Sequence, residues 1–300
     1  MSAATVLTAP APASAPSPTP PPSPTTSFGI DAYPVLDLIT GRARTGAYGP
    51  DPASLRIALA FGTTQAVRHS GRTRGYRNEV LSLRLGAAVG SCAVEPGDLP
   101  ADTVTDCVGA TVDELLDHPH TAVRVAALDA YLGHCLPHAP AYGARRFGLP
   151  AGSSLVKSRV RAAAVVGLLP LAAVRRVLVV GVVNSLLEQL RSNEVGYLPC
   201  DLKGGTTEWD EPVHTDALAH LDDCDAILAS GMTLGNGTLD PLLTHARATG
   251  KPLVLFAQTG SAVLPRLIGD GVTAVSAEPY PFFWLDGGPS LLHLYGGAKR

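Results

Sequence analysis

The chain has 300 residues, 46% of them hydrophobic and 16% charged, which is enough for about two globular domains with sizeable cores. Its formal net charge of -3 leaves no basic excess for phosphate backbones, so we expect no nucleic acid as the main partner. The start lacks the positive n-region of a signal peptide, and no apolar run reaches the roughly 18 residues that a membrane span needs. The 5 cysteines are scattered and never spaced as Cys-x-x-Cys, which is typical of reduced thiols. We therefore expect a cytoplasmic protein without a membrane partner.

The N-terminal half begins with a segment of biased composition. Residues 1–27 consist mainly of Pro, Ala, Ser and Thr and contain no charged side chain, which predicts a disordered tail. Apolar residues then alternate over 55–59 and 80–85, as in a β-hairpin, and residues 112–134 change to helical spacing. This sequence of patterns predicts an α+β domain over residues 28–150.

The second half has a different pattern, in which short apolar runs alternate with helical segments. Such alternation implies a parallel sheet covered on both faces. The predicted fold class is therefore α/β, with the α+β domain followed by a Rossmann-like domain over residues 151–290 and a tail over residues 291–300. The predicted strands cover 176–181, 196–200, 225–230, 253–256 and 272–275, and the predicted helices cover 155–169, 185–190, 213–221, 239–248 and 261–268.

The stretch 229–243, ASGMTLGNGTLDPLL, combines a strand end, a glycine-rich loop and a helix start. Thr238 is expected to cap the helix with its hydroxyl, while Asp240 and Pro241 suit the first helical turn. In an open parallel sheet, ligands bind outside such carboxyl ends of strands. The alternative is a loop whose glycines serve backbone geometry alone. Three glycines beside threonine and asparagine favour a ligand site.

The turn after the first predicted parallel strand does not fit a dinucleotide site. It reads Gly181-Val-Val-Asn184 and lacks the further glycines that let a pyrophosphate approach the backbone, so NAD and FAD are disfavoured. Asp201 follows the second predicted strand, where an acid can accept hydrogen bonds from a ribose. A nucleoside cofactor such as S-adenosylmethionine fits this pattern, and so does a purely structural acid at a strand end.

Polar side chains follow three predicted strands and are expected to converge at one cleft. They suit a carboxylate, a phosphate or a ribose more than a soft metal, with amides of the glycine loop completing the pocket. The candidate ligand-binding residues are Gly181, Asn184, Asp201, Ser230, Gly231, Thr233, Asn236, Gly237, Thr238, Gln258 and Thr259. No catalytic residue is assigned, because Ser230 lacks the Gly-x-Ser-x-Gly elbow of a nucleophile and no histidine lies beside it.

One segment is rich in side chains that bind transition metals. Its members are His118, His120, His134, Cys135 and His138. His134 and His138 are four residues apart and are the candidate ligands of a divalent transition metal. However, Pro137 lies between them and interrupts a helical face, and histidines near a helix end also interact with its dipole without any metal. Both interpretations stay open at this stage.

Two further segments have open roles. The block Glu278–Leu285, EPYPFFWL, concentrates aromatic residues. It suits core packing, and its functional alternatives are a lid over the pocket, a stacking surface for a flat ligand, or the interface of a homodimer. The basic segment over residues 72–77 is typical of a solvated hairpin tip, and its alternative is an anion clamp that reaches over the cleft.

The chain resembles a family of two-domain proteins described as putative heavy-metal chelation proteins. The clearest match is Ser230-Gly-Met-Thr-Leu-Gly-Asn-Gly-Thr-Leu239, which is similar to the family's Thr-Gly-Thr-Thr-(Leu/Ile)-x-Asn-Gly-Thr-Leu. Weaker matches are Val179-Val-Gly181 and Cys107-Val-Gly-Ala-Thr-Val-Asp-Glu-Leu115. The resemblance covers residues 30–285 and implies an enolase-N-like domain followed by a Rossmann-like domain.

This chain departs from the family pattern at two turns. Family members often carry His-Phe-Pro after the glycine of the first strand, whereas this chain has Val182-Val183-Asn184, so any ligand group from that histidine is absent here. The later Gly-Pro-Ser/Thr turn is replaced by Ala257-Gln258-Thr259-Gly260. The resemblance therefore implies the fold and leaves the chemistry to the site itself.

Two functional hypotheses follow. The first is a protein that binds a small polar ligand or a metal complex in the cleft between its domains, in the manner of heavy-metal chelation. The second is an enzyme of small-molecule biosynthesis that uses a nucleoside cofactor such as S-adenosylmethionine, bound along Gly181, Asp201 and residues 231–238. A purely oligomeric scaffold is disfavoured, because a scaffold needs no polar glycine loop at a strand end.

Overall fold

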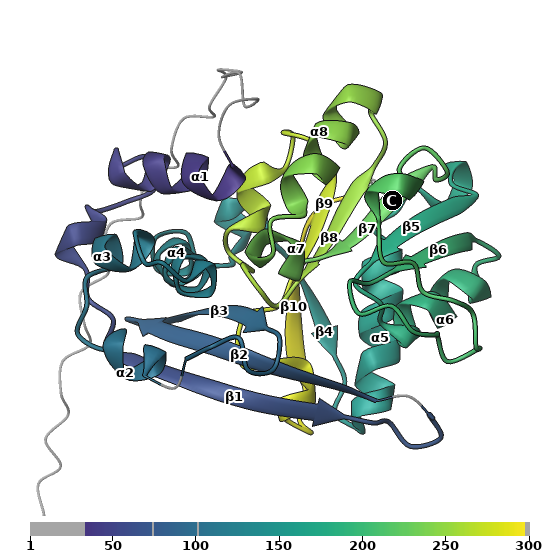
Figure 1. Ribbon diagram of the computed structural model, residues 1–300, viewed down its shortest axis with the longest axis horizontal. Helices are drawn as coiled ribbons and strands as arrows, with labels where there is room; N and C mark the ends of the chain where they lie inside the picture. Colours follow the sequence, from purple (N-terminus) through teal and green to yellow (C-terminus); the bar gives the residue numbers. More distant parts are fainter. Residues whose placement is uncertain (1–33, 74, 101, 298–300) are drawn as a thin grey trace, which may run out of the picture.

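The computed structural model describes residues 34–73, 75–100 and 102–297. The predicted tail over residues 1–27 lies outside the described residues. The remaining chain is organised by a 3-stranded sheet from the N-terminal half and a 7-stranded sheet from the C-terminal half (Figure 1). The predicted fold class, an α+β domain followed by a Rossmann-like domain, is confirmed.

The N-terminal half is an antiparallel meander with helices packed against it, which confirms the predicted α+β arrangement. Its strands are β1 (Leu59–Val67), β2 (Tyr76–Leu85) and β3 (Ala88–Val94), in the order β1-β2-β3. Its helices are α1 (Val35–Arg44), α2 (Thr103–Asp106), α3 (Val112–Leu116) and α4 (Thr121–Cys135), with a 3-10 turn at Pro52–Ser54. A capping box begins α3, since the Thr111 hydroxyl accepts from the Glu114 amide while the Glu114 carboxylate accepts from the Thr111 amide.

Close packing of β3 on α4 depends on Gly90. A Cβ atom added at Gly90 would lie 2.0 Å from the backbone nitrogen of Ala130 and 2.2 Å from the backbone oxygen of Ala126. Because both neighbours are backbone atoms of α4, they can move away only if the helix itself shifts. We expect Gly90→Ala to lower the free energy of unfolding by about 1–3 kcal/mol, the usual cost of overpacking a core.

Urea denaturation followed by circular dichroism measures this change. Gly41→Ala in α1 is the matched control, because nothing lies within 4 Å of a Cβ added there. Alanine is favoured over glycine inside a helix, so the control is expected to raise the free energy of unfolding by about 0.5–1 kcal/mol. Equal stability of Gly90→Ala and the wild type would contradict the packing described here.

The C-terminal half is built on the larger sheet, whose strand order is β4-β10-β9-β8-β7-β5-β6. The parallel strands are β5 (Arg176–Val180), β6 (Gly196–Cys200), β7 (Ala226–Ser230), β8 (Leu253–Ala257) and β9 (Ala274–Ala277), and the antiparallel ones are β4 (Arg145–Leu149) and β10 (Ser290–Gly296). The helices are α5 (Ser154–Val166), α6 (Asn184–Ser192), α7 (Met232–Gly235) and α8 (Leu239–Thr249). Short 3-10 turns lie at Pro140–Tyr142, Leu171–Ala173, Leu218–His220, Leu264–Leu267 and Phe283–Leu285.

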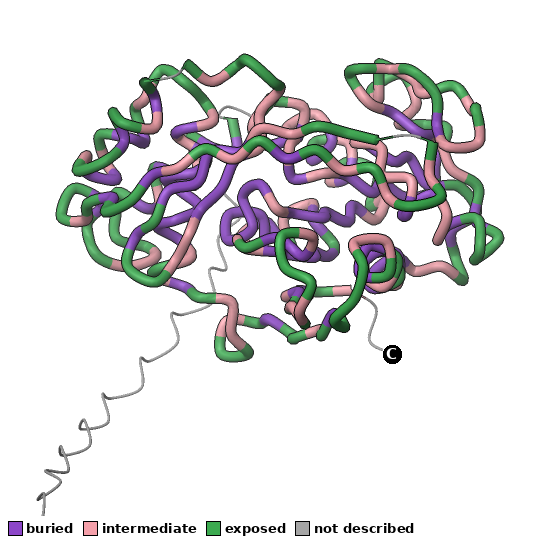
Figure 2. The backbone as a smooth tube through the Cα atoms, turned by 90° about the horizontal axis from the view of Figure 1, so that it is seen from below, coloured by how far each residue is buried: buried purple, intermediate pink, exposed green. Residues whose placement is uncertain are grey.

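Alternate residues of the parallel strands belong to two hydrophobic cores, one on each face of the sheet. Val177 and Val179 pack with α5 and α6, whereas Leu178 and Val180 belong to a core that continues through α8 into the N-terminal half. Figure 2 shows the buried segments running through the middle of the molecule, with exposed loops around them. A continuous apolar run therefore marks a strand that is covered on both faces.

The edge of the larger sheet differs from the predicted organisation. Residues 291–296, predicted as part of a tail, belong to β10, because Leu292, Leu294 and Tyr295 are buried. Its partner β4 lies within the predicted N-terminal domain in sequence, yet it pairs with β10 in the C-terminal sheet. Residues 298–300 of the predicted tail lie outside the described residues.

Two predicted helices are shorter in the structure. Only the 3-10 turn Leu218–His220 forms within the predicted helix 213–221, and only Leu264–Leu267 within 261–268. Pro265 in the second segment lacks an N–H, and tertiary packing buries its neighbours without a full helix. Across the described ranges, none of the helices is long and apolar enough to cross a membrane.

Candidate functional site

The carboxyl ends of β5 and β7 form a topological switch point. β5 pairs with β6 on one side and with β7 on the other, so the chain leaves β5 toward one edge of the sheet and later continues toward the opposite edge. In such sheets the diverging connections open a crevice that binds ligands. Gly181 lies in it with a φ of 88°, and a Cβ added to Gly181 would lie 2.7 Å from the Ser230 Cβ. Both facts require glycine there.

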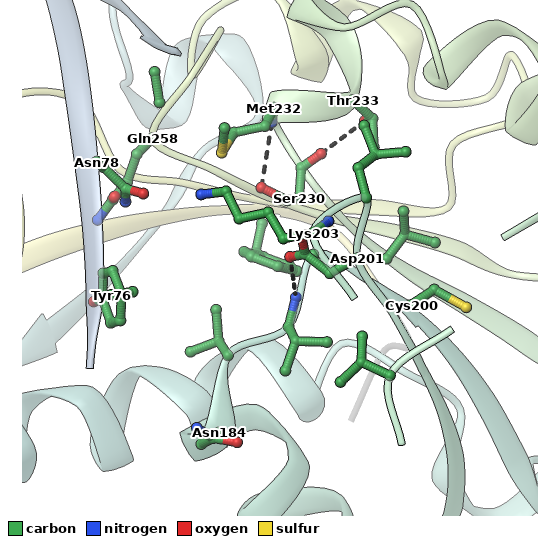
Figure 3. Close-up of a pocket in the computed structure, with 18 of the residues that line it drawn as sticks. Tyr76, Asn78, Asn184, Cys200, Asp201, Lys203, Ser230, Met232, Thr233 and Gln258 are labelled. Carbon is green, nitrogen blue, oxygen red and sulfur yellow. Dashed lines mark hydrogen bonds between the residues drawn. The ribbon is translucent and has the colours of Figure 1, made fainter. Parts of the chain in front are cut away.

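A pocket of about 480 Å³ occupies this crevice (Figure 3). Its walls come from both halves of the chain, including the β1–β2 hairpin, which reaches over to α5 (Figure 1), where the His69 Nδ1 lies 2.9 Å from the Ser154 hydroxyl. The predicted ligand-binding residues that line the pocket are Gly181, Asn184, Asp201, Ser230, Thr233, Asn236, Thr238, Gln258 and Thr259. Gly231 and Gly237 are absent from the lining. The structure thus brings most of the predicted set together, while their binding of a ligand stays a prediction.

Asp201 shapes the loops beside the switch point. Its carboxylate accepts hydrogen bonds from the Val182 amide at 3.2 Å and the Lys203 amide at 3.1 Å, one on each oxygen. The acid therefore joins the turn after β5 to the turn after β6. Each carboxylate oxygen has a further lone pair, so these bonds leave acceptor capacity for a ligand.

The predicted cap of α8 by the Thr238 hydroxyl is wrong. Thr238 stands at the N-terminal boundary of α8, but its hydroxyl donates to the Asn236 Oδ1 at 2.7 Å and caps nothing. The Thr238 amide donates to the same oxygen at 3.1 Å. Asp240, in the first turn as predicted, accepts instead from the Val35 amide at 2.7 Å and so ties α1 to α8.

Several other predicted residues have partners within the fold. The Thr233 hydroxyl donates to the Ser230 carbonyl at 2.7 Å, and the Thr259 hydroxyl accepts from the Ala93 amide of β3 at 2.9 Å. The Asn184 Oδ1 accepts from the Glu208 amide at 3.1 Å. These bonds hold the pocket walls in place.

Gln258 is different, because its side-chain nitrogen is enclosed and has no hydrogen-bond partner. Tyr76 and Asn78 of β2 lie on the same side of the pocket (Figure 3). Burial raises the pKa of Tyr76, so its hydroxyl stays protonated and can donate. An enclosed donor without a partner is costly, and a ligand acceptor would relieve that cost. Tyr76 and Asn78 were not predicted from the sequence, because no local pattern shows which residues of a distant hairpin line this crevice.

Among the described residues that line the pocket, carboxylates outnumber cationic side chains. The cations are Arg72, Arg161 and Lys203, and the acids are Glu95, Asp201, Glu208 and Asp216. Each cation already forms an ion pair, with Arg72 to Glu188 at 2.5 Å, Arg161 to Glu278 at 2.8 Å and Lys203 to Glu95 at 2.6 Å. Asp201 and Asp216 take no part in these ion pairs, so the pocket favours a neutral or positively charged ligand.

The hairpin segment over residues 72–77 does not provide a free anion clamp at Arg72, because that guanidinium is neutralised by Glu188 of α6. Arg77 pairs with Glu79 of its own strand at 2.8 Å, and residue 74 lies outside the described residues. Pairing with acids fastens the hairpin onto the C-terminal half. It also removes the positive charge that an anionic ligand would need.

The aromatic block over 278–285 serves core packing and also reaches the pocket. Phe282 and Phe283 are buried, and Phe283 and Trp284 line the pocket. The Trp284 indole donates to the Gln65 side chain at 2.7 Å, and its ring meets Tyr76 edge-on with centroids 5.8 Å apart. Aromatic surface from this block therefore forms the apolar part of the wall.

The predicted metal ligands lie in different surroundings. The His134 ring borders the turn at Gly86, whereas the His138 ring stacks on His293 with centroids 4.8 Å apart. Within the described part of the chain, no group of three or more His, Cys, Asp or Glu residues could hold a metal ion. These side chains do not fit a bare metal ion.

A family model matches residues 164–277, the part of the chain that carries β5 to β9 and the switch point. The matching model is that of DUF364, a family described as putative heavy-metal chelation, so this part of the chain is similar to that family. No curated protein matches the chain.

Two solved DUF364 structures, both of unknown function, have a similar fold. The protein from Pyrococcus horikoshii is 18% identical, with a TM-score of 0.50 over 81% of this chain and 86% of its own. The protein from Desulfitobacterium hafniense is 17% identical, with a TM-score of 0.54 over 81% of this chain and 85% of its own. At this identity the likeness concerns the fold, which extends over both halves of the chain.

Proposed function

We propose that this protein binds a small polar ligand in the pocket between its two halves. The observation that carries the proposal is the pocket of about 480 Å³ at the β5–β7 switch point, walled by both halves. This volume lies within the range of roughly 300–1,000 Å³ that is usual for small-molecule sites. Aromatic side chains on one wall and hydrogen-bonding groups on the others are the usual composition of such a site.

The charge of the lining supports a ligand that is neutral or cationic. A carboxylate or phosphate would face the acids Asp201 and Asp216, and the nearby cations are already paired. Gln258 and Tyr76 offer donors to a neutral acceptor such as a carbonyl, amide or hydroxyl oxygen. Of the ligand groups predicted from the sequence, this charge distribution favours the ribose over the carboxylate and the phosphate.

The family description concerns heavy metals, and the side chains of residues 34–73, 75–100 and 102–297 include no group of three or more His, Cys, Asp or Glu that could hold a bare ion. A metal would therefore enter this pocket as part of a complex that brings its own donor atoms. A neutral complex with an organic chelator can form hydrogen bonds with the polar lining and is not repelled by its carboxylates. In such a complex the metal is cargo, and no side chain of the protein is its ligand.

The second candidate is an enzyme that uses a nucleoside cofactor such as S-adenosylmethionine. Asp201 favours it, because this acid follows β6, next to the switch point, and keeps acceptor capacity for a ribose hydroxyl. The cationic sulfonium of S-adenosylmethionine also suits the acid excess of the lining. No residue is assigned a catalytic role.

Native mass spectrometry of freshly purified protein, followed by thermal-shift and calorimetric titration, tests the proposal. The probes are S-adenosylmethionine, S-adenosylhomocysteine, NAD, ATP, nickel chloride, and nickel with excess histidine as a neutral complex. We expect a retained small molecule, or stabilisation by a neutral or cationic organic probe, and no stabilisation by nickel chloride alone. Gln258→Leu is expected to weaken that binding about tenfold, since one buried hydrogen bond is lost.

Gln189→Leu is the matched control, because Gln189 of α6 is absent from the pocket lining. Stabilisation by an adenosine compound that Asp201→Asn abolishes would select the second candidate. Absence of any retained molecule, together with no stabilisation by any probe, would contradict ligand binding in this pocket.

A further inference from the structure

A second cluster of titratable side chains lies where β10 meets the end of α4, away from the pocket. We call it the β10 cluster, and its members are His138, Arg146, Arg266, His293 and Tyr295. They come from the segment after α4, from β4, from the 3-10 turn Leu264–Leu267 and from β10. None of them lines the pocket at the switch point.

Arg266 is a half-buried cation whose side chain has no partner in the described chain. Its Nε is enclosed and bonds to nothing, and no hydrogen bond or ion pair to a described residue involves its guanidinium. Burial lowers the pKa of Arg266, which reflects the cost of desolvating an uncompensated charge. Buried guanidinium groups are normally paired with a carboxylate or phosphate, so Arg266 lacks the partner that its position calls for.

His293 supplies a second enclosed nitrogen without a partner. Its Nδ1 makes no hydrogen bond, and its ring stacks on His138 at a centroid distance of 4.8 Å with an interplanar angle of 23°. The His138 Nδ1 lies 2.8 Å from the Tyr295 hydroxyl, which fixes the orientation of the stack. Burial lowers the pKa of His138 to about 3 and also lowers the pKa of His293. Both rings are therefore neutral at pH 7, and a neutral ring still carries one N–H donor.

No carboxylate of the described residues balances the cluster. The charged groups that act on the pKa values of His138 and His293 are other members of the cluster, namely Arg266 and Arg146. Arg146 stands opposite His293 in the β4–β10 register, so both side chains lie on the same face of the sheet. Arg146 thus acts on His293 and Arg266 acts on His138, the ring stacked on it, which produces a locally positive potential around the stacked rings.

We propose that the β10 cluster binds a small tetrahedral oxyanion, for which phosphate is the model ligand. Arg266 donates to it from two of its fork-like N–H groups, and His293 donates from Nδ1. Arg146 adds a second positive charge from the neighbouring strand. The anion supplies the acceptors that both enclosed nitrogens lack, and the Tyr295–His138 contact holds the imidazole stack in position.

Isothermal titration of the full chain with inorganic phosphate, at constant ionic strength, tests this site. We expect saturable binding by the wild type, competition by sulfate and none by chloride. Arg266→Gln is expected to raise the phosphate Kd at least about tenfold, because a charge-assisted pair of hydrogen bonds is lost. His293→Phe keeps the stacked ring but removes Nδ1, and it is expected to raise the Kd about three- to tenfold.

Arg176→Gln is the matched control, because Arg176 is an exposed arginine at the start of β5, outside the cluster. It removes the same charge and is expected to leave the Kd unchanged, as is the pocket variant Gln258→Leu. His293→Phe provides an independent test if Arg266→Gln does not fold by circular dichroism. Absence of phosphate binding by the wild type, or an unchanged Kd in the cluster variants, overturns the proposal. Equal weakening by Arg266→Gln and Arg176→Gln overturns it as well, since that result indicates non-specific charge.

Discussion

Glu278→Gln is expected to lower the free energy of unfolding by about 3–5 kcal/mol, the usual cost of breaking a buried ion pair from one side. The Glu278 carboxylate accepts from the Arg161 Nε at 2.8 Å and from the Phe283 amide at 2.6 Å. The side chains of Arg161 and Glu278 are only 6% and 2% exposed. The guanidinium also lies 5.6 Å from the ring centroids of Phe256 and Phe283. Loss of the negative charge would leave a desolvated cation among aromatic rings.

Urea denaturation with far-ultraviolet circular dichroism measures the effect of Glu278→Gln. The matched control is Glu95→Gln, which breaks the Lys203–Glu95 pair, whose side chains are 55% and 43% exposed. Exposed pairs contribute about 0–1 kcal/mol, so the control is expected to remain near the wild type. The double variant Arg161→Met/Glu278→Leu is expected to recover most of the lost stability, because no unpaired charge remains. A loss below about 1 kcal/mol in Glu278→Gln would contradict the buried pair.

Asp129→Ala is expected to lower the free energy of unfolding by about 2–6 kcal/mol, because it leaves two buried amides without an acceptor at about 1–3 kcal/mol each. Asp129 of α4 is 2% exposed. Its carboxylate accepts from the Ser91 amide of β3 at 2.9 Å and from the Ala262 amide at 2.6 Å. Ala262 lies in the loop between β8 and β9, so one carboxylate fastens the N-terminal half to the larger sheet.

The same denaturation assay compares Asp129→Ala with two related variants. Asp129→Asn keeps one acceptor oxygen and is expected to lose about half as much stability, since one amide remains paired. Asp98→Ala is the control at an exposed loop position, where a change within about 0.5 kcal/mol is expected. Similar stability of Asp129→Ala and Asp98→Ala would show that the two amides are satisfied in another way.

Local patterns predicted the central strands of the larger sheet. The apolar runs at β5, β7 and β8 are buried on both faces, and runs of this length without polar residues are typical of parallel strands. The glycine-rich stretch after β7 also lies at the carboxyl end of its strand, as predicted. Such features depend on residues that are neighbours in the sequence, so they can be predicted from the sequence alone.

The candidate site was predictable only in part. Asp201, Ser230 and Gln258 line the pocket because the carboxyl ends of parallel strands meet at one edge of a sheet. Thr238 also lines it, yet its hydroxyl bonds to Asn236 instead of capping α8, because that side-chain oxygen lies within reach. Helical spacing alone could not show whether the Thr238 hydroxyl accepts from a helix amide or donates to Asn236.

Tertiary structure decided the remaining wall of the pocket and its charge. Tyr76 reaches the crevice because the β1–β2 hairpin is fastened to the C-terminal half by contacts such as Arg72–Glu188, which join residues far apart in the sequence. The pairing of β10 with β4 likewise joins distant segments and creates the β10 cluster. By itself the sequence determined the central parallel strands and the placement of a polar loop at a strand end, because these follow from local periodicity. Which side chains share a pocket, and which cations are neutralised there, followed only from long-range packing, because those contacts leave no local pattern in the chain.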